Sequence, residues 1–262
     1  MNKNAFTLAE ILITLGIIGV VAAITMPALI ANYQKAVIKN QFKKTYSAIN
    51  QAFLKAQNDL GYTPGCYWWS DGAKVPHKCI SWAETGFCNK YASLDGSPLP
   101  ADLNGDTSDC AVFGEAVAKN LQIVKTCLTK SVSNKCSPSY LGIDDIKRRA
   151  DENLSDEDMN KAVGGEGKAF YKKELSNGGA FVLADGTIII FTDSRSAFNP
   201  VGFAVDVNGF KGPNKWGVDV FSFISASNSA SGPIYLRHGR VTIIDSDAGG
   251  VSTLTMIQNM SK

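Results

Sequence analysis

A single carboxylate lies inside a long apolar stretch near the start of the chain. Residues 6–30 read FTLAEILITLGIIGVVAAITMPALI, and Glu10 is their only ionisable side chain. A carboxylate inside a bilayer costs about 2.5–3.5 kcal/mol on insertion scales, so such a group normally has a partner and a function. This position therefore predicts ion pairing in a place with little water. The alternative is that Glu10 lies at the membrane surface and extends toward the lipid headgroups.

Six cysteines provide a second kind of chemistry. They lie within a window of 71 residues, at Cys66, Cys79, Cys88, Cys110, Cys127 and Cys136. No Cys-x-x-Cys pair occurs, which argues against a zinc ribbon or a thioredoxin-type site. Their even number predicts up to three disulfides and an oxidising compartment. Among the 15 connectivities we expect short-range pairs such as Cys127 with Cys136. The alternative is a cytosolic protein with six reduced, buried cysteines.

Enzymatic chemistry finds little support in the sequence. The chain has two histidines, His77 and His238, and no Gly-x-Ser-x-Gly elbow, Walker loop or His-Glu-x-x-His motif. Carboxylates such as Asp144, Asp145 and Asp156 fall in charged runs, which are typical of solvated surfaces. The formal net charge of +2 gives no global attraction to nucleic acid or anionic lipid. We therefore predict that the protein is not an enzyme.

The elements that must position these groups begin with one long helix. Residues 6–30 would extend roughly 37 Å, longer than the ~30 Å hydrocarbon core of a bilayer. The apolar run is too long for an ordinary secretory signal peptide. Apolar residues then recur at steps of three to five up to Ala56, so we expect an amphipathic continuation that ends near residues 58–61. Pro27 predicts a kink or local melting, or alternatively the end of the helix at the bilayer edge.

The rest of the chain is long enough to bury a packed core. Composition divides it into a cysteine-rich section at 59–138, a polar section at 139–177 and a β-rich section at 178–262. Asp185-Gly186 lies between two apolar runs and predicts a hairpin with a tight primed turn. We expect further strands at residues 201–207, 220–224, 234–237 and 240–245, and a helix at 112–124. The predicted fold is α+β, with an antiparallel sheet packed on the amphipathic half of the long helix.

Residues 1–55 resemble the N-terminal region of type IV prepilins and type II secretion pseudopilins. A short basic leader, Phe6, Glu10 and Pro27 occur at the spacing of this family. The resemblance implies that a prepilin peptidase cuts between Ala5 and Phe6 and N-methylates Phe6, although the family usually has glycine before the cut. The new amine would lie four residues from Glu10. The two charges are then able to compensate each other within or between subunits.

The resemblance also implies partners, location and domain organisation. The implied partners are the prepilin peptidase, other pilin or pseudopilin subunits, an inner-membrane assembly platform and, before assembly, membrane lipid. The chain would divide into a leader at 1–5, a transmembrane and assembly helix at 6–58 and a globular domain at 59–262. Before assembly the helix would cross the inner membrane once, with the globular domain in the periplasm or at the cell surface. After assembly the protein would be part of a filament.

One segment of the β-rich section resembles a pattern found in many pilin-like proteins. It reads DVNGFKGPNKWGVDVF and contains the oxygen-bearing residues Asp206, Asn208, Asn214 and Asp219. Ca²⁺ prefers such ligands, and related pseudopilins have a calcium loop near the C-terminus, so the resemblance makes these four residues candidate Ca²⁺ ligands. The spacing does not match an EF-hand. The alternative is a turn-rich connection between strands that is fixed by Gly, Pro and Asn.

The resemblance predicts a structural subunit, a minor pilin or pseudopilin, of a type IV pilus or a type II secretion filament. Burial of apolar surface between helices would drive assembly. The alternative is a ligand-binding minor pilin for DNA uptake, adhesion or recognition of a secreted substrate. For that role, residues 67–69 and Trp82 are candidates for an exposed aromatic platform with Lys74, Lys78 and Lys90 nearby. We favour instead their packing against the disulfides as core, so nucleic acid has no specific support as a partner.

Overall fold

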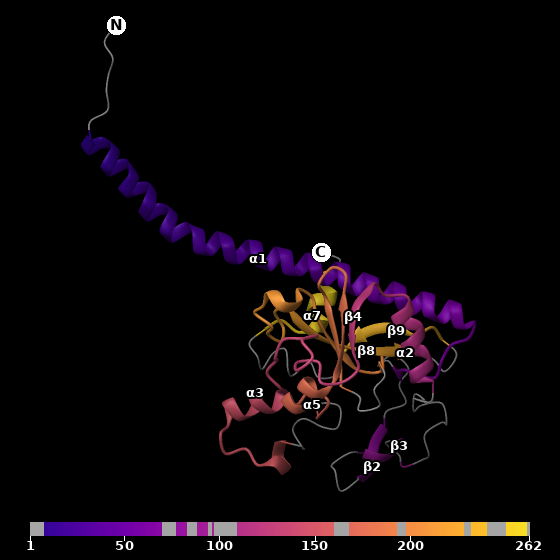
Figure 1. Ribbon diagram of the computed structural model, residues 1–262. Coiled ribbons are helices and arrows are strands. Elements are labelled where there is room, and N and C mark those ends of the chain that lie inside the picture. The colour runs from indigo at the N-terminus through magenta and orange to yellow at the C-terminus, as the bar shows by residue number, and fades with distance from the viewer. Residues whose placement is uncertain are drawn as a thin grey trace. The chain divides into compact units, whose positions relative to one another are not determined.

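The computed structural model describes residues 8–69, 77–82, 88–93, 96, 109–159, 168–192, 198–227, 232–239 and 250–260 (Figure 1). Among these, the side chains of residues 68–69, 77–79, 82, 88–91 and 93 are not described. The chain divides into two compact units, Met1–Asn40 and Gln41–Lys262. Helix α1 (Leu8–Leu60) crosses this boundary, so its two parts are treated separately.

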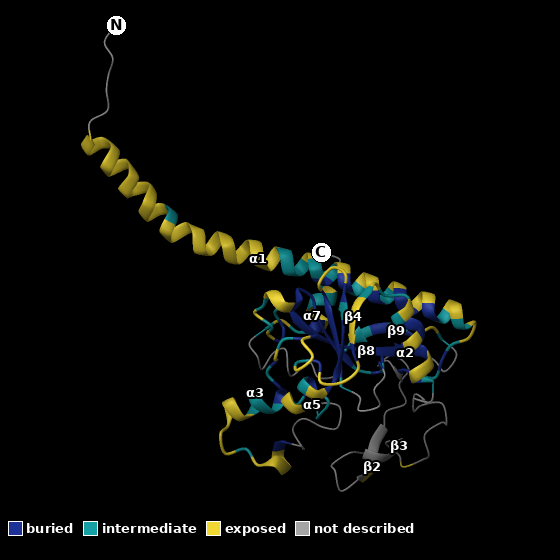
Figure 2. Cartoon of the chain, in the orientation of Figure 1, coloured by how far each residue is buried: buried dark blue, intermediate teal, exposed yellow. Residues whose placement is uncertain are grey.

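The first part of α1 is a continuous apolar helix. It contains a stretch that is long and apolar enough to cross a membrane, although a signal sequence near an N-terminus passes the same test. None of that stretch is buried, as the exposed colouring of Figure 2 shows. The helix is unbroken at Pro27, so both the predicted local melting and a helix end at this residue are wrong. Melting would release further backbone donors and acceptors in an apolar segment, whereas a continuous helix satisfies all but those at the proline.

The second part of α1 packs on the sheet of the Gln41–Lys262 unit through one face. The buried residues recur at helical spacing: Phe42, Thr45, Ile49, Ala52, Phe53 and Ala56. The ring of Phe42 lies 4.7 Å from that of Phe221 and 5.9 Å from that of Phe223, between centroids. The helix ends at Leu60, within the predicted range, and the N–H of Gly61 donates to the oxygen of Gln57 at 3.0 Å. Gly61 has a φ of 73°, as is usual for a residue that caps a helix in the left-handed conformation.

A seven-stranded sheet forms the centre of this unit within the described residues. Its order is β1-β8-β7-β6-β5-β4, and β9 pairs with β8. All pairs are antiparallel except β1 with β8, which is parallel. The strands are β1 (Trp68–Trp69), β4 (Ile123–Cys127), β5 (Gly179–Leu183), β6 (Ile188–Phe191), β7 (Phe203–Asp206), β8 (Val220–Ser227) and β9 (Tyr235–His238). Strands β2 (His77–Trp82) and β3 (Cys88–Ser93) form a separate antiparallel pair.

Short helices surround the sheet. They are α2 (Cys110–Lys119), α3 (Ile143–Ala150), α5 (Lys172–Asn177), α7 (Thr253–Gln258) and the 3₁₀ turn η1 (Gly209–Lys211). Strands β6, β7 and β8 are buried along their whole length (Figure 2). A cluster of aromatic rings fills the core beside them, and the ring of Phe198 lies within 5.5 Å of those of Phe181, Phe191 and Phe203. Such edge-to-face pairs add to the free energy of burial.

Side chains of helix α1 also bond the backbone of strand β9 and of the residue just before it. The side-chain amide of Gln57 donates to the main-chain oxygen of Ile234 at 2.8 Å and accepts from its N–H at 2.7 Å. Asn50 Oδ1 accepts from the N–H of Leu236, and the hydroxyl of Tyr46 donates to the Leu236 oxygen, both at 3.1 Å. These side chains take the place of a neighbouring strand along β9. They therefore block the pairing with other chains that an open strand edge invites.

The predicted α+β fold, with its long helix and antiparallel sheet, is confirmed. The hairpin on either side of Asp185-Gly186 is also correct, but its turn is not the predicted primed turn. The N–H of Gly186 donates to Leu183 and the N–H of Leu183 to Thr187, so three residues form the loop. Only Gly186 among them has a positive φ, of 91°. This is the pattern of a three-residue loop with a bulge, which needs one left-handed residue rather than two.

Two further predictions from sequence need adjustment. The helix expected at 112–124 lies at Cys110–Lys119, and the chain then forms β4 from Ile123 to Cys127. No local pattern marks a strand at Ile123–Cys127, because the apolar spacing of the helix continues across the helix end. Residues 240–245, where a strand was expected, lie outside the described residues.

Candidate functional site

The residues expected to act in processing and assembly lie at the start of α1. Ala5 and Phe6 are outside the described residues, so the cleavage position stays a prediction. Glu10 lies on α1, close to the first described residue, Leu8. Its main-chain oxygen accepts from the hydroxyl of Thr14 at 2.9 Å. Pro27 lies in the interior of the same apolar stretch.

Two disulfides are present among the described side chains. Cys127 pairs with Cys136, which confirms the predicted short-range bond, and Cys66 pairs with Cys110. The side chains of Cys79 and Cys88 are outside the described residues, although their backbones lie on the paired strands β2 and β3. A disulfide joins the end of β4 to the loop that follows it, and the other fixes the start of α2 to the segment after α1.

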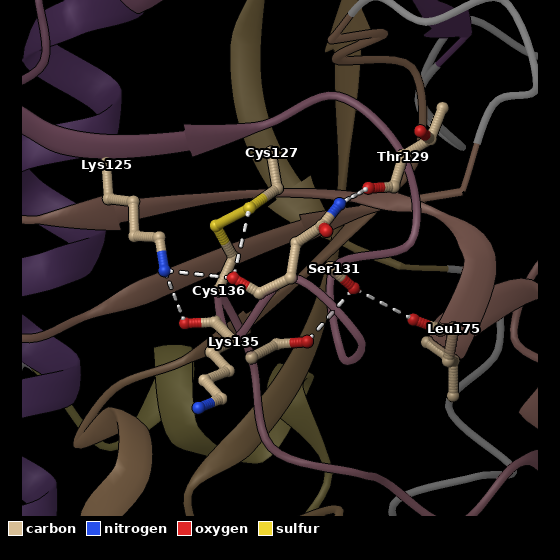
Figure 3. The surroundings of a disulfide bond; sticks show 9 residues. Lys125, Cys127, Thr129, Ser131, Lys135, Cys136 and Leu175 are labelled. Atoms are coloured by element: carbon tan, nitrogen blue, oxygen red, sulfur yellow. Dashed lines mark hydrogen bonds between the residues drawn. A yellow bond between two sulfur atoms is a disulfide. The ribbon is translucent and has the colours of Figure 1, made fainter.

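The loop closed by Cys127 and Cys136 is held by hydrogen bonds, as Figure 3 shows. The ammonium of Lys125 donates to the main-chain oxygens of Asn134 and Lys135, at 2.9 Å each. The hydroxyl of Ser131 donates to the oxygen of Leu175 in α5 at 3.3 Å. The last carbonyls of a helix have no partner inside it, so this loop provides part of the α5 cap.

The four candidate calcium ligands do come together. They lie on the loop that joins β7 to β8, and both Asp206 and Asp219 are fully buried. Asp206 Oδ1 accepts from the N–H groups of Asn208 and Gly209, at 3.1 and 2.7 Å. Its other oxygen accepts from the hydroxyl of Tyr140 at 3.0 Å. The carboxylate thus closes the loop in the way that a buried Asx turn does.

Asp219 holds the other end of the same loop. Its carboxylate accepts from the N–H of Asn214 at 2.8 Å and from the N–H of Lys215 at 2.6 Å. The Asn208 amide donates to the oxygen of Gly212 at 2.8 Å. With its amide nitrogen toward Asp206, Asn214 also donates to a carboxylate oxygen of Asp206 at 3.2 Å. Asn214 has a positive φ of 55°, which asparagine adopts more readily than most residues.

These contacts do not fit a Ca²⁺ site. Ca²⁺ takes six to eight oxygen ligands, as a rule. Here each oxygen of both carboxylates already accepts from at least one N–H or O–H donor, which leaves few of the oxygen contacts that the ion needs. The one buried oxygen of the set without a partner is Oδ1 of Asn208. Among the described residues there is also no group of three or more His, Cys, Asp or Glu that could hold a metal ion. The arrangement has the features of the alternative, a turn-rich connection held by side-chain hydrogen bonds.

Burial changes the acidity of this cluster. Burial and the nearby charge of Asp219 raise the pKa of Asp206 to about 7, although donated hydrogen bonds work in the opposite direction. Burial, and then the charge of Asp206, raise the pKa of Tyr140 well above its usual value. Tyr140 therefore stays a proton donor to Asp206 throughout the physiological range. Sequence reasoning missed Tyr140, because it lies 66 residues from Asp206 and no local pattern connects them.

The proposed aromatic platform is largely untested. The side chains of Trp68, Trp69 and Trp82, together with Lys74, Lys78 and Lys90, lie outside the described residues. Tyr67 is buried, at 6% exposure, which agrees with packing in the core.

The family model described as the prokaryotic N-terminal methylation motif matches residues 1–26. This motif is the prepilin-type signal of type IV pilins and pseudopilins, so the resemblance seen in the sequence is confirmed. No curated protein and no solved structure gave a significant match. The motif supports a pilin-like structural subunit rather than an enzyme, processed by a prepilin peptidase and assembled with other pilin subunits. Together with the apolar helix it fits single-pass anchoring in the inner membrane before assembly.

Proposed function

We propose that the chain is a structural subunit, a minor pilin or pseudopilin, of a type IV pilus or a type II secretion filament. It enters the filament through its N-terminal helix after removal of a leader at residues 1–5. The observation that carries the proposal is the methylation motif at residues 1–26, which overlaps the start of the 53-residue helix Leu8–Leu60.

The two parts of this helix support a change of environment. One face of its second part is buried in the Gln41–Lys262 unit, whereas no part of the apolar stretch is buried. Side chains such as Leu12, Ile18 and Ile24 are more than 60% exposed. Removing a large apolar side chain from water is worth about 1.5–3 kcal/mol. A bilayer before assembly, and neighbouring helices after it, would each provide that burial.

We propose that Glu10 sets the register of assembly. Cleavage between Ala5 and Phe6 would leave a cationic, N-methylated amine on Phe6, which pairs with the carboxylate of Glu10 on the same or a neighbouring subunit. An unpaired carboxylate in an apolar environment is costly, so packing out of register is disfavoured. Pro27 lacks an amide donor, so we propose it as the point where the helix adapts its curvature on entering the filament.

The globular domain, at residues 59–262, is proposed to lie outside the cytoplasm. The two described disulfides support this location, because disulfides persist in oxidising compartments and are rare in the cytosol. The structure of α1 ends at Leu60, close to the proposed domain boundary.

Mass spectrometry of the mature N-terminus tests the processing step. We expect the full chain, produced with a prepilin peptidase, to begin at a methylated Phe6, and the same chain without the peptidase to retain residues 1–5. For assembly, Glu10→Gln is expected to abolish incorporation into filaments. The control Glu115→Gln removes an exposed carboxylate on α2 that pairs with Lys119 in the same helix. A native chain that keeps its first five residues, with filaments unaffected by Glu10→Gln, would overturn the proposal.

A further inference from the structure

A cleft of about 650 Å³ lies in the Gln41–Lys262 unit and is lined in part by residues of α3 and α5. Four segments line it: the loop before α3, the α3 helix, the start of α5 and the end of the β7–β8 loop. The lining residues that matter for the argument are Leu141, Ile146, Arg149, Lys172, Lys215 and Trp216. The apolar members form much of the wall, and the three cationic side chains are exposed.

The walls of the cleft are fixed by contacts within the protein. The indole N–H of Trp216 donates to the oxygen of Leu141 at 2.8 Å. The main-chain N–H of Lys172 donates to Asp144 Oδ1, also at 2.8 Å, which joins the start of α5 to α3. Tyr140, another lining residue, is held by Asp206 as described above. A ligand would thus meet a site that is already formed, and the entropic cost of ordering it on binding is small.

The charge of the cleft has one sign. Arg149, Lys172 and Lys215 line it, and none of the described lining residues is acidic. Lys172 lies 3.6 Å from the carboxylate of Asp145, but Arg149 and Lys215 have no ion pair among the described residues. These cations are also not the partners of the buried carboxylate of Asp206. Its pKa is set by burial, by the charge of Asp219 and by three hydrogen-bond donors. The positive charge is therefore available to a ligand.

The lining also limits the kind of ligand. The rings of Tyr140 and Trp216 are only 2% and 1% exposed, so neither offers a face on which a nucleobase could stack. Three cations around one hollow suit a compact group with two or three negative charges better than a long run of phosphates. The half-buried Leu141 and the exposed Ala150 leave some apolar surface next to the cations, which suits a ligand that also has an apolar part. A peptide in which acidic residues flank an aliphatic one has both properties.

We propose that this cleft binds an acidic peptide segment of a partner protein. Its carboxylates pair with Arg149 and Lys215, and with Lys172 at the edge, while an aliphatic side chain packs against Leu141 and Ala150. Arginine is suited to this role because its guanidinium can hold a carboxylate with two parallel hydrogen bonds. The inference goes beyond the structural role proposed above, and it does not depend on leader cleavage or filament assembly.

Fluorescence anisotropy with the full chain in detergent micelles tests it. The probe is a fluorescein-labelled peptide of sequence Glu-Leu-Glu-Glu-Leu-Glu, and the same peptide with lysine in place of glutamate is its control. We expect the acidic probe alone to bind, and the affinity to fall as salt is raised. The double variant Arg149→Gln with Lys215→Gln should weaken binding about tenfold or more, since it removes two charge-assisted contacts.

A matched protein control is Lys173→Gln. Lys173 follows Lys172 in α5 and is also exposed, but it is not among the residues that line the cleft. We expect it to bind the probe as the wild type does. The proposal is overturned by no binding at about 1 mM protein, by equal losses in Lys173→Gln and the double variant, or by no loss in the double variant. Tighter binding of an oligo-dT that is lost in the double variant would also overturn it, in favour of nucleic acid.

Discussion

Replacement of Asp206 by asparagine should make the stability of the protein less sensitive to pH. Asp206 is fully buried, and its pKa is raised to about 7 by burial and by Asp219. In Asp206→Asn the side-chain oxygen still accepts from the N–H groups of Asn208 and Gly209, and the amide can donate to the oxygen of Tyr140. The substitution thus keeps the shape of the loop and removes the proton equilibrium.

The sign and size of the effect follow from linkage. Well below pH 3.8, the ordinary pKa of the group, the carboxyl is protonated in both the folded and the unfolded chain, so this group contributes no pH dependence. Between pH 4 and pH 7 the unfolded chain loses the proton while the folded chain keeps it, and stability falls as the pH rises. The pKa changes from 3.8 to about 7. A difference of one in pKa corresponds to about 1.4 kcal/mol, so the free energy of unfolding falls by about 4 kcal/mol because of this group. The fall is complete near pH 8.

Denaturant unfolding of the full chain in micelles, followed by circular dichroism from pH 4 to pH 8, measures this quantity. We expect the free energy of unfolding of Asp206→Asn, relative to that of the wild type, to increase by about 4 kcal/mol in total as the pH rises. The control Glu152→Gln removes an exposed carboxylate shortly after α3 and should follow the wild-type profile. Parallel profiles for the wild type and Asp206→Asn would refute the reasoning, because Asp206 would then be ionised in the folded protein as in the unfolded one.

Three further predictions concern the same unit. Replacing Cys127 and Cys136 by serine should cost about 3 kcal/mol of stability in denaturant unfolding, because a loop of this length then regains its freedom in the unfolded chain; equal stability of the oxidised and substituted chains would contradict this. Gln57→Ala should cost about 1–3 kcal/mol, since it leaves the N–H and C=O of Ile234 without their partner, whereas the exposed Gln51→Ala should change little. Thermal unfolding should have the same midpoint with Ca²⁺ as with a chelator, because the loop between β7 and β8 does not fit the ion; a higher midpoint with Ca²⁺ would mean that its hydrogen bonds rearrange.

Much of the fold could be predicted because its signals are local. The apolar run and the amphipathic spacing that follows it identify α1, and the spacing of Phe42, Ile49 and Phe53 identifies the buried face. The runs on either side of Asp185-Gly186 identify β5 and β6 for the same reason. The Cys127–Cys136 pair also lies within nine residues of sequence. Each of these features depends on residues that are near one another in the chain.

The remaining features depend on contacts across the chain, and the sequence gives no direct sign of them. The bond from Tyr140 to Asp206 joins a loop before α3 to the end of β7, and Gln57 reaches Ile234 across 177 residues. Nothing in the spacing of these residues distinguishes them from other polar positions. The same holds for the cleft, because Arg149, Lys172 and Lys215 come from three segments and only the fold brings them together.

The two parts of α1 differ in what can bury them. The second part packs within the Gln41–Lys262 unit, whereas the apolar stretch is exposed. In the second part, polar side chains such as Asn50 and Gln57 bond the backbone of β9, and Phe42 enters the core. Those contacts commit this half to its own domain. The apolar stretch has no buried residue, and Glu10 is its only charged side chain, so its hydration is unfavourable. We propose that lipid or other helices bury it. In the proposed role of Glu10, its carboxylate would make the choice among such arrangements selective, because arrangements that leave the carboxylate without a partner are penalised.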